Sequence, residues 1–95
     1  MSTDSREAAL RLLLKQASLL LNEVEEPFWS SRIDKALVSV DAHEVLSWFG
    51  GMGSFNDLVI ANVNGHRVKP SQEPQVNARL DALRSQLYQL AKQLS

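Results

Sequence analysis

The stretch that decides the fold is LRLLLKQASLLLN, residues 10–22. Its apolar residues recur at spacings of three and four, which places them on one face of an α-helix. They are Leu10, Leu13, Leu14, Ala17, Leu20 and Leu21. Two further leucines, Leu12 and Leu19, widen the stripe, so we expect neighbours to cover this helix on more than one side. The pattern predicts a first helix over about residues 4–22.

A second long stripe closes the chain. Apolar residues there alternate between spacings of four and three, which predicts a helix over about residues 72–94. The stripe consists of Val76, Leu80, Leu83, Leu87, Leu90 and Leu94. It has two interpretations: it docks along the first helix in an antiparallel bundle, or it forms a seam with a second copy in a homodimer.

Two shorter helices are predicted between these stripes. Pro27 suits the first turn of a helix, and residues 27–39 continue with apolar residues on one face. Asp41 followed by Glu44 resembles a capping box and predicts a short helix over about residues 42–49.

The segment after these helices is predicted to bend and then to return on itself. Residues 50–57 read GGMGSFND, and this density of glycine excludes regular structure. The run LVIANV that follows is rich in β-branched residues, and Asn64-Gly65 is a strong signal for a hairpin turn. We therefore predict a β-hairpin over about residues 58–69, ended by Pro70. The expected fold is a single domain over residues 1–95, mostly α (α+β), with about four helices in a small bundle and one hairpin after the glycine-rich loop.

Composition excludes several classes of protein. Apolar residues make up 44% and charged residues 22% of the chain, which is a globular balance. The net charge of −1 argues against a nucleic-acid-binding protein, and no apolar run is long enough to span a membrane. The chain has no cysteine, and its polar first residues do not resemble a signal peptide, so we expect a cytoplasmic protein.

The glycine-rich loop resembles neither of the common nucleotide-binding motifs. No lysine follows it as a P-loop requires, and Asn56 stands where the last glycine of a dinucleotide-binding motif would fall. Its first interpretation is structural, because glycines allow positive φ and short polar side chains bond nearby main-chain amides. The residues concerned are Gly50, Gly51, Gly53, Ser54, Asn56 and Asp57. The second interpretation is an anion-binding nest of main-chain amides.

The sequence holds no recognisable catalytic or metal-binding pattern. His43, His66, Ser54 and Asp57 are residue types of a catalytic triad, but nothing in their spacing brings them together. Two histidines without cysteine, and without the i, i+4 spacing of a zinc motif, do not predict a metal site. We expect no enzyme activity, no metal and no cofactor.

Acidic and aromatic residues are the candidates for binding a partner. Residues 1–50 carry eight acids against five bases, and a patch of acids would attract a basic protein surface. Trp48 and Phe49 cannot both face the same core line, because successive helix residues are about 100° apart. We expect one of them to lie under the glycine loop or at the surface. The candidate partner-binding residues are Glu23, Glu25, Glu26, Asp41, Glu44, Trp48, Met52 and Phe55.

Two segments resemble the signature of a small bacterial family of unknown function. Residues 46–59 read LSWFGGMGSFNDLV, which resembles the W-F-G-G-M-G-S-F-N-D-L core of that family. Residues 79–91 read RLDALRSQLYQLA, which resembles its closing helix. The resemblance implies a short stand-alone protein with an N-terminal amphipathic helix, and it brings no activity with it. In size and acidity the chain also resembles immunity proteins and antitoxins.

From these features we expect a non-catalytic protein that works by binding another protein. Its most concrete form is a bacterial immunity protein or antitoxin that occludes a toxin encoded nearby. Two alternatives remain: a small-ligand or anion-binding module that uses the glycine loop, and a structural homodimer joined through the closing leucine stripe.

Overall fold

The protein is described by a computed structural model that covers residues 2–50 and 54–95. Within these residues the chain forms four α-helices, three short 3-10 helices and no β-strand. The α-helices are α1 (Ser2–Glu23), α2 (Pro27–Ser39), α3 (Ala42–Ser47) and α4 (Glu73–Leu94), and the 3-10 helices are η1 (Phe55–Asp57), η2 (Asn62–Asn64) and η3 (Pro70–Gln72). The prediction of a mostly helical protein with about four helices is confirmed. Of the helices described, none is long and apolar enough to cross a membrane.

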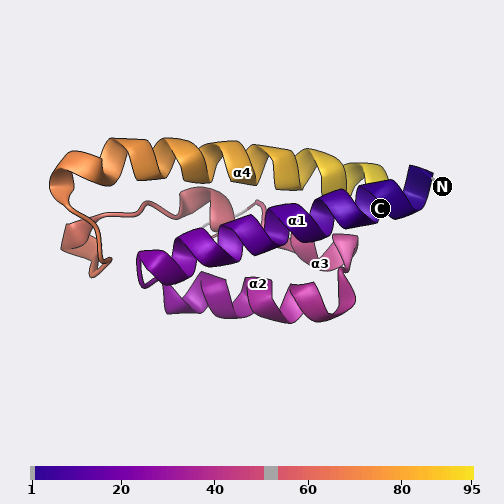
Figure 1. Cartoon of the computed structure of the whole chain (residues 1–95), viewed down its shortest axis with the longest axis horizontal. Helices are drawn as coiled ribbons and strands as arrows, with labels where there is room; N and C mark the ends of the chain where they lie inside the picture. The colour runs from indigo at the N-terminus through magenta and orange to yellow at the C-terminus, as the bar shows by residue number, and fades with distance from the viewer. Residues whose placement is uncertain (1, 51–53) are drawn as a thin grey trace.

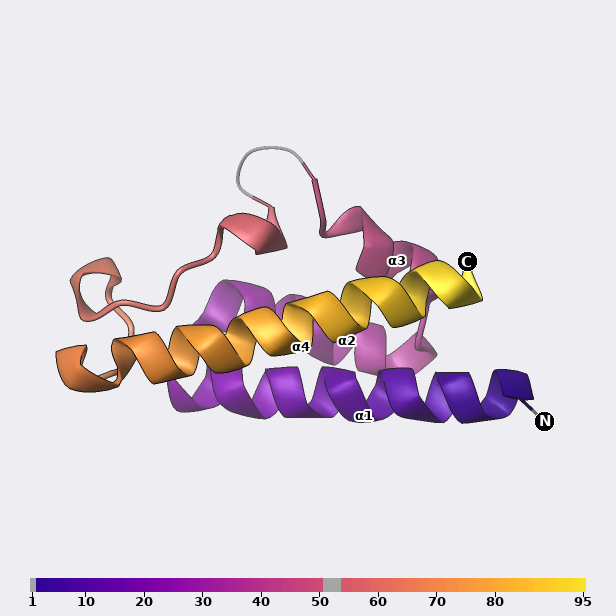
Figure 2. The ribbon, with the colours of Figure 1, turned by 90° about the horizontal axis from the view of Figure 1, so that it is seen from above.

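The three long helices lie side by side. Figure 1 shows α1 between α2 and α4, with both neighbours antiparallel to it, so that the two ends of the chain lie at the same end of the molecule. Seen from above, α3 and the segment after the glycine-rich loop lie on the far side of α4 from α1 (Figure 2). This segment leads to the beginning of α4, and the beginning of α4 lies at the opposite end of the molecule from α3.

The core is formed by the apolar faces of these helices. From α1 it takes Leu10, Leu14, Ala17 and Leu21, each fully buried. The closing leucine stripe of α4 faces the same core: Leu80, Leu83 and Leu87 are buried, and Val76, Leu90 and Leu94 pack against it while partly buried. The closing leucine stripe therefore packs against helices of its own chain. Much of the surface predicted as a possible dimer seam lies inside the bundle.

All six aromatic residues of the chain belong to one connected set of ring contacts. The rings are Phe28, Trp29, Trp48, Phe49, Phe55 and Tyr88, and neighbouring centroids lie 4.8–6.2 Å apart. Aromatic pairs attract one another at such separations. Phe55 of η1 is fully buried at the centre of the set, whereas Phe28 on α2 and Tyr88 on α4 reach the surface. The set therefore links α2, α3, η1 and α4 across the molecule.

The predicted β-hairpin over residues 58–69 is wrong. Among the residues described there is no strand, and Asn64 and Gly65 belong to the turn around η2 instead of joining two strands. Gly65 ends η2 with a φ of 88°, so the glycine supplies a left-handed conformation as expected, but in a different turn. Val63, the last residue of the β-branched run, is 91% exposed.

The main chain of this segment bonds to side chains of α4 in place of a partner strand. The carboxamide of Asn77 accepts a hydrogen bond from the Ile60 amide at 2.8 Å and donates one to the Ile60 carbonyl at 2.8 Å. Glu73 accepts from the Asn62 amide at 3.1 Å. Buried main-chain groups need hydrogen-bond partners, and Asn77 supplies them for the fully buried Ile60, while Glu73 bonds the exposed Asn62, so neither residue needs a partner strand.

A buried histidine ties the same segment to the turn between α1 and α2. The Nδ1 atom of His66 accepts from the Ala61 amide at 3.1 Å, so its ring proton lies on Nε2, which donates to Glu26 at 3.2 Å. The Arg67 amide donates to the carbonyl of Val24, near the end of α1, at 2.8 Å. The segment is thus bonded to α4 through Asn77 and Glu73, and to the turn between α1 and α2 through His66 and Arg67.

Candidate functional site

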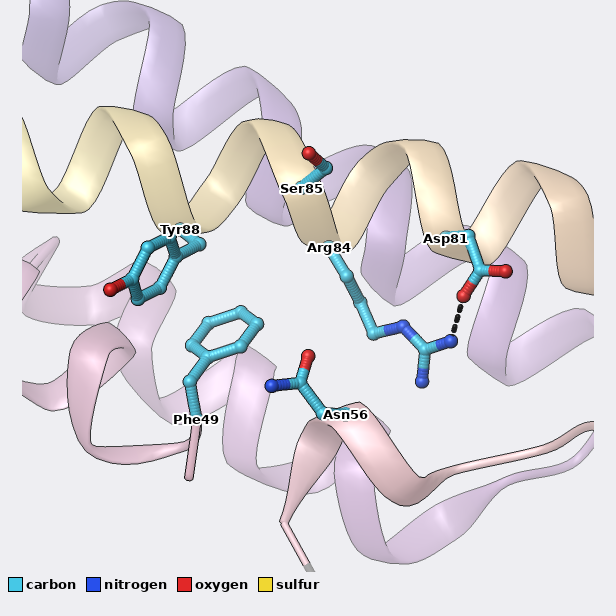
Figure 3. A pocket seen from close by; sticks show the side chains of 6 residues that line it. All are labelled: Phe49, Asn56, Asp81, Arg84, Ser85 and Tyr88. Carbon is cyan, nitrogen blue, oxygen red and sulfur yellow. Dashed lines mark hydrogen bonds and ion pairs between the residues drawn. The ribbon is translucent and has the colours of Figure 1, made fainter. Parts of the chain in front are cut away.

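A depression lies where the end of α3, η1 and the middle of α4 meet (Figure 3). Its volume is about 380 Å³. The lining residues are Phe49, Asn56, Asp81, Arg84, Ser85 and Tyr88. Phe49 and Asn56 belong to residues 46–59 and the other four to residues 79–91. The two segments that resemble the family signature therefore meet at this depression, which we treat as the candidate site.

One half of the depression is aromatic. The rings of Phe49 and Tyr88 meet edge to face, with their centroids 5.3 Å apart and their planes at 68°. Phe49 is partly buried against Phe55 of the core, whereas Tyr88 is 41% exposed. The Nζ atom of Lys92, one helical turn further along α4, lies 5.9 Å from the centre of the Tyr88 ring. The core thus holds the Phe49 ring in place, and the Tyr88 ring beside it remains partly exposed.

The other half is centred on Arg84, which is 8% exposed. Its Nη1 atom donates to the carbonyls of Phe55 at 2.7 Å and Leu58 at 2.8 Å, and its Nη2 atom donates to the carboxylate of Asp81. These bonds satisfy two carbonyl oxygens around η1 and fix that turn against α4. The positive charge of Arg84 is paired with Asp81, so the depression carries a compensated charge pair instead of a free cation.

Three polar groups at the depression have no partner among the residues described. Within residues 2–50 and 54–95, the carboxamide of Asn56 and the hydroxyls of Ser85 and Tyr88 make no hydrogen bond. Figure 3 shows the Asn56 carboxamide directed into the space between Phe49 and Arg84. A carboxamide offers one acceptor oxygen and two N–H donors. The depression therefore combines exposed aromatic surface with unused hydrogen-bonding groups.

The five acidic candidates do not form one patch. Glu23, Glu25 and Glu26 lie at the end of α1 and in the turn before α2, whereas Asp41 and Glu44 lie at the beginning of α3. The 13 residues of α2 stand between the two groups. At a rise of about 1.5 Å per residue this separation is roughly 20 Å. A single acidic surface built from these five residues is therefore not present.

Several of these acids have structural roles. Glu26 accepts from the Trp29 amide at 2.9 Å and so caps α2, and Asp41 accepts from the His43 amide at 2.9 Å and so caps α3. Glu25 pairs with Arg67 at 3.4 Å in an exposed contact, and Glu44 accepts from the indole of Trp48 at 3.4 Å. These contacts give Glu25, Glu26, Asp41 and Glu44 roles within the fold that need no partner protein.

The structure assigns the aromatic candidates differently from the prediction. Trp48 and Phe55 are buried, with 1% and 0% of their surface exposed, so neither can contact a partner in this fold. Phe49 is the member of the Trp48-Phe49 pair that leaves the core line, and it reaches the depression. Met52 lies outside the described residues.

The glycine-rich loop is described only at its ends. Gly50 has a φ of 101°, in the left-handed region that glycine adopts without strain, and Gly51 and Gly53 lie outside the described residues. The hydroxyl of Ser54 is buried and has no hydrogen-bond partner among the residues described. Within residues 2–50 and 54–95, the side chains of Ser54 and Asn56 therefore make none of the expected local bonds. Asp57 lies in η1, at the end of the loop.

The two histidines lie at opposite ends of α2. His43 is in the first turn of α3, whereas His66 contacts Glu26 at the turn that precedes α2. Neither forms a hydrogen bond to the Ser54 hydroxyl. In the described part of the chain, no group of three or more His, Cys, Asp or Glu side chains is placed to hold a metal ion.

Sequence reasoning missed the four residues of the site that lie on α4, which are Asp81, Arg84, Ser85 and Tyr88. Arg84 and Tyr88 are four residues apart and lie beside the leucine stripe, so they share the edge of that helix that faces η1. An arginine and a tyrosine at this spacing along an apolar stripe are the signal that could have found them. It also missed Phe28, which is 61% exposed on α2 with the guanidinium of Arg32 at 5.3 Å from its ring.

The fold and the depression together define a small helical protein with an aromatic and hydrogen-bonding surface site. Comparison with protein families gives one match: the family described as a domain of unknown function (DUF6966) matches residues 22–69, which is half of the chain. The chain belongs to this family. Comparison with curated proteins and with solved structures finds no significant match. The matched region includes α2, α3, η1 and η2, and with them Phe49 and Asn56 of the depression.

Proposed function

We propose that this chain is a non-catalytic protein that works in the cytoplasm by binding another protein. Its most concrete form is an immunity protein or antitoxin that occludes a toxin encoded nearby. The observation that carries the proposal is the depression between α3, η1 and α4, where an exposed aromatic ring stands beside hydrogen-bonding groups to which no described residue bonds.

The residue types at this site support binding to a protein. Tyrosine is enriched among the residues that dominate binding energy at protein interfaces, because it combines a large contact area with hydrogen bonding. Tyr88 is held by the Phe49 ring, so it loses little conformational freedom when a partner covers it. Phe28, with Arg32 against its ring, is a second exposed aromatic residue of the same kind on α2.

The test is to express the product of the neighbouring gene with and without this chain. The proposal predicts that the neighbouring product alone slows growth, that co-expression restores growth, and that the two proteins purify as a stoichiometric complex. A neighbouring product that is harmless and does not copurify with the chain contradicts the immunity form of the proposal.

A second candidate function is the binding of a small molecule at the same depression. Its volume of about 380 Å³ falls at the lower end of the range for small-ligand pockets, roughly 300–1,000 Å³. A thermal-shift screen separates this candidate from the first, because a ligand at 100 times its dissociation constant adds about 2.7 kcal/mol of stability. A metabolite or nucleotide that raises the melting temperature of wild type, but not of Tyr88→Ala, would favour it.

A further inference from the structure

The proposed function leaves open what part of a partner the depression receives, and the charges at the site restrict the answer. Arg84 is the only cation among the six lining residues, and Asp81 already pairs with it, while the exposed Lys92 beside the depression lies with its Nζ atom over the Tyr88 ring. Two carbonyl oxygens take further N–H groups of the same guanidinium. A free anion would compete with these bonds and with the Asp81 carboxylate, so a neutral group is the better complement.

The carboxamide of Asn56 can bind a neutral main chain. Asn77 shows the geometry in the same molecule, because its carboxamide accepts from the amide and donates to the carbonyl of one non-helical residue, Ile60, at 2.8 Å each. Asn56 carries the same group, exposed and without a partner among the residues described. It is therefore suited to hold one main-chain unit of an extended peptide by the same two bonds.

The aromatic half of the depression supplies a place for a side chain. A residue held by Asn56 would lie beside the rings of Phe49 and Tyr88, since Figure 3 shows the carboxamide directed into the space next to Phe49. Edge and face contacts to these rings favour another aromatic or a large aliphatic side chain over a charged one. The volume of about 380 Å³ is enough for such a side chain and its flanking main chain.

We infer that the depression receives an extended segment of the partner protein, with one main-chain unit bonded to Asn56 and a large apolar side chain packed on Phe49 and Tyr88. The inference rests on the proposed function, and it names the chemistry of the partner at this site. The partner segment is expected to be neutral beside Arg84, because Asp81 already compensates the charge of that residue.

The test uses a displayed library of random twelve-residue peptides selected on the wild-type protein. The expected peptides share an aromatic or large aliphatic residue and no excess of acids. Their affinity should fall by at least about tenfold, which corresponds to about 1.4 kcal/mol, in Tyr88→Ala and in Asn56→Ala. The matched control is Gln89→Ala, an exposed residue of α4 that does not line the depression. It should bind the peptides as wild type does.

A second variant separates a bonding role of Asn56 from a structural one. Asn56→Asp keeps the shape of the side chain but loses both N–H donors, so it should weaken the peptides while the melting temperature stays at the wild-type value. Selected peptides that are mainly acidic, peptides that bind Tyr88→Ala and Asn56→Ala as well as wild type, or a library that yields no binder would each overturn the inference. Each of these outcomes would overturn the inference without overturning the proposed function. A partner that binds another face of the chain would still restore growth and copurify in the co-expression test.

Discussion

The replacement of Asn77 by alanine tests the finding that side chains of α4 hold the segment after the glycine-rich loop. Asn77 makes two hydrogen bonds to Ile60 and donates a third, at 2.8 Å, to the carbonyl of Glu73 within its own helix. Ile60 is fully buried. Asn77→Ala therefore leaves a buried amide and a buried carbonyl without partners, while the neighbouring helix stays intact.

The expected cost follows from these two groups. An unsatisfied buried polar group costs about 1–3 kcal/mol, so the pair would cost roughly 2–4 kcal/mol if water reaches them only in part. Alanine is the better helix former by about 0.5 kcal/mol, which offsets a small share of the loss. We expect a net loss of about 1.5–3.5 kcal/mol in the free energy of unfolding, with Asn77→Asp in between because it keeps the acceptor for the Ile60 amide.

Urea denaturation followed by tryptophan fluorescence measures this loss, since Trp29 and Trp48 are both buried in the native protein. The matched control is Asn64→Ala, whose exposed side chain makes a single hydrogen bond at 3.4 Å in the same segment, and it should change stability by less than about 0.5 kcal/mol. If Asn77→Ala is as stable as Asn64→Ala, the account of how this segment is held is refuted.

Four further substitutions test the packing and the turns of the fold, each by the same denaturation assay. Arg84→Lys should lose about 2–3 kcal/mol, because one ammonium cannot replace a guanidinium that bonds two carbonyls and a carboxylate, and wild-type stability would contradict this role. Phe55→Ala should lose about 3–5 kcal/mol because the Phe55 ring is fully buried, whereas Phe28→Ala should lose about 1 kcal/mol or less because Phe28 is exposed. Equal losses would contradict the assignment of Phe55 to the core and Phe28 to the surface. Gly65→Ala should lose about 1–2 kcal/mol from its φ of 88° alone, because no atom lies within 4 Å of the added methyl group, and an unchanged midpoint would argue against this turn.

The helical part of the fold could be predicted because its signal is local. The stripes around Leu14 and Leu87 repeat at the helical period over several turns, and burial of one face follows directly from that spacing. The structure of residues 58–69 could not be predicted from a local pattern in this way. Asn64-Gly65 fits two kinds of turn, and the choice is made by Asn77, which bonds to Ile60 from 17 positions further along the chain.

The site shows the same limit. Spacing established that Trp48 and Phe49 point in different directions, but only the position of α4 decides that Phe49 is the one beside the surface. The acids were predicted as a surface patch because their number in the first half is visible in the sequence. Their local roles, such as the cap that Glu26 provides to α2, depend on where each helix begins.

The central claim is that the depression at Tyr88 and Asn56 is where the chain binds a partner protein. The most direct measurement is isothermal titration of the neighbouring gene product into wild type, Tyr88→Ala, Asn56→Ala and the control Gln89→Ala. The account predicts that the two variants at the depression bind at least about tenfold more weakly than wild type, and that Gln89→Ala binds equally well. Wild-type affinity in all four proteins, or no binding in any of them, would contradict it.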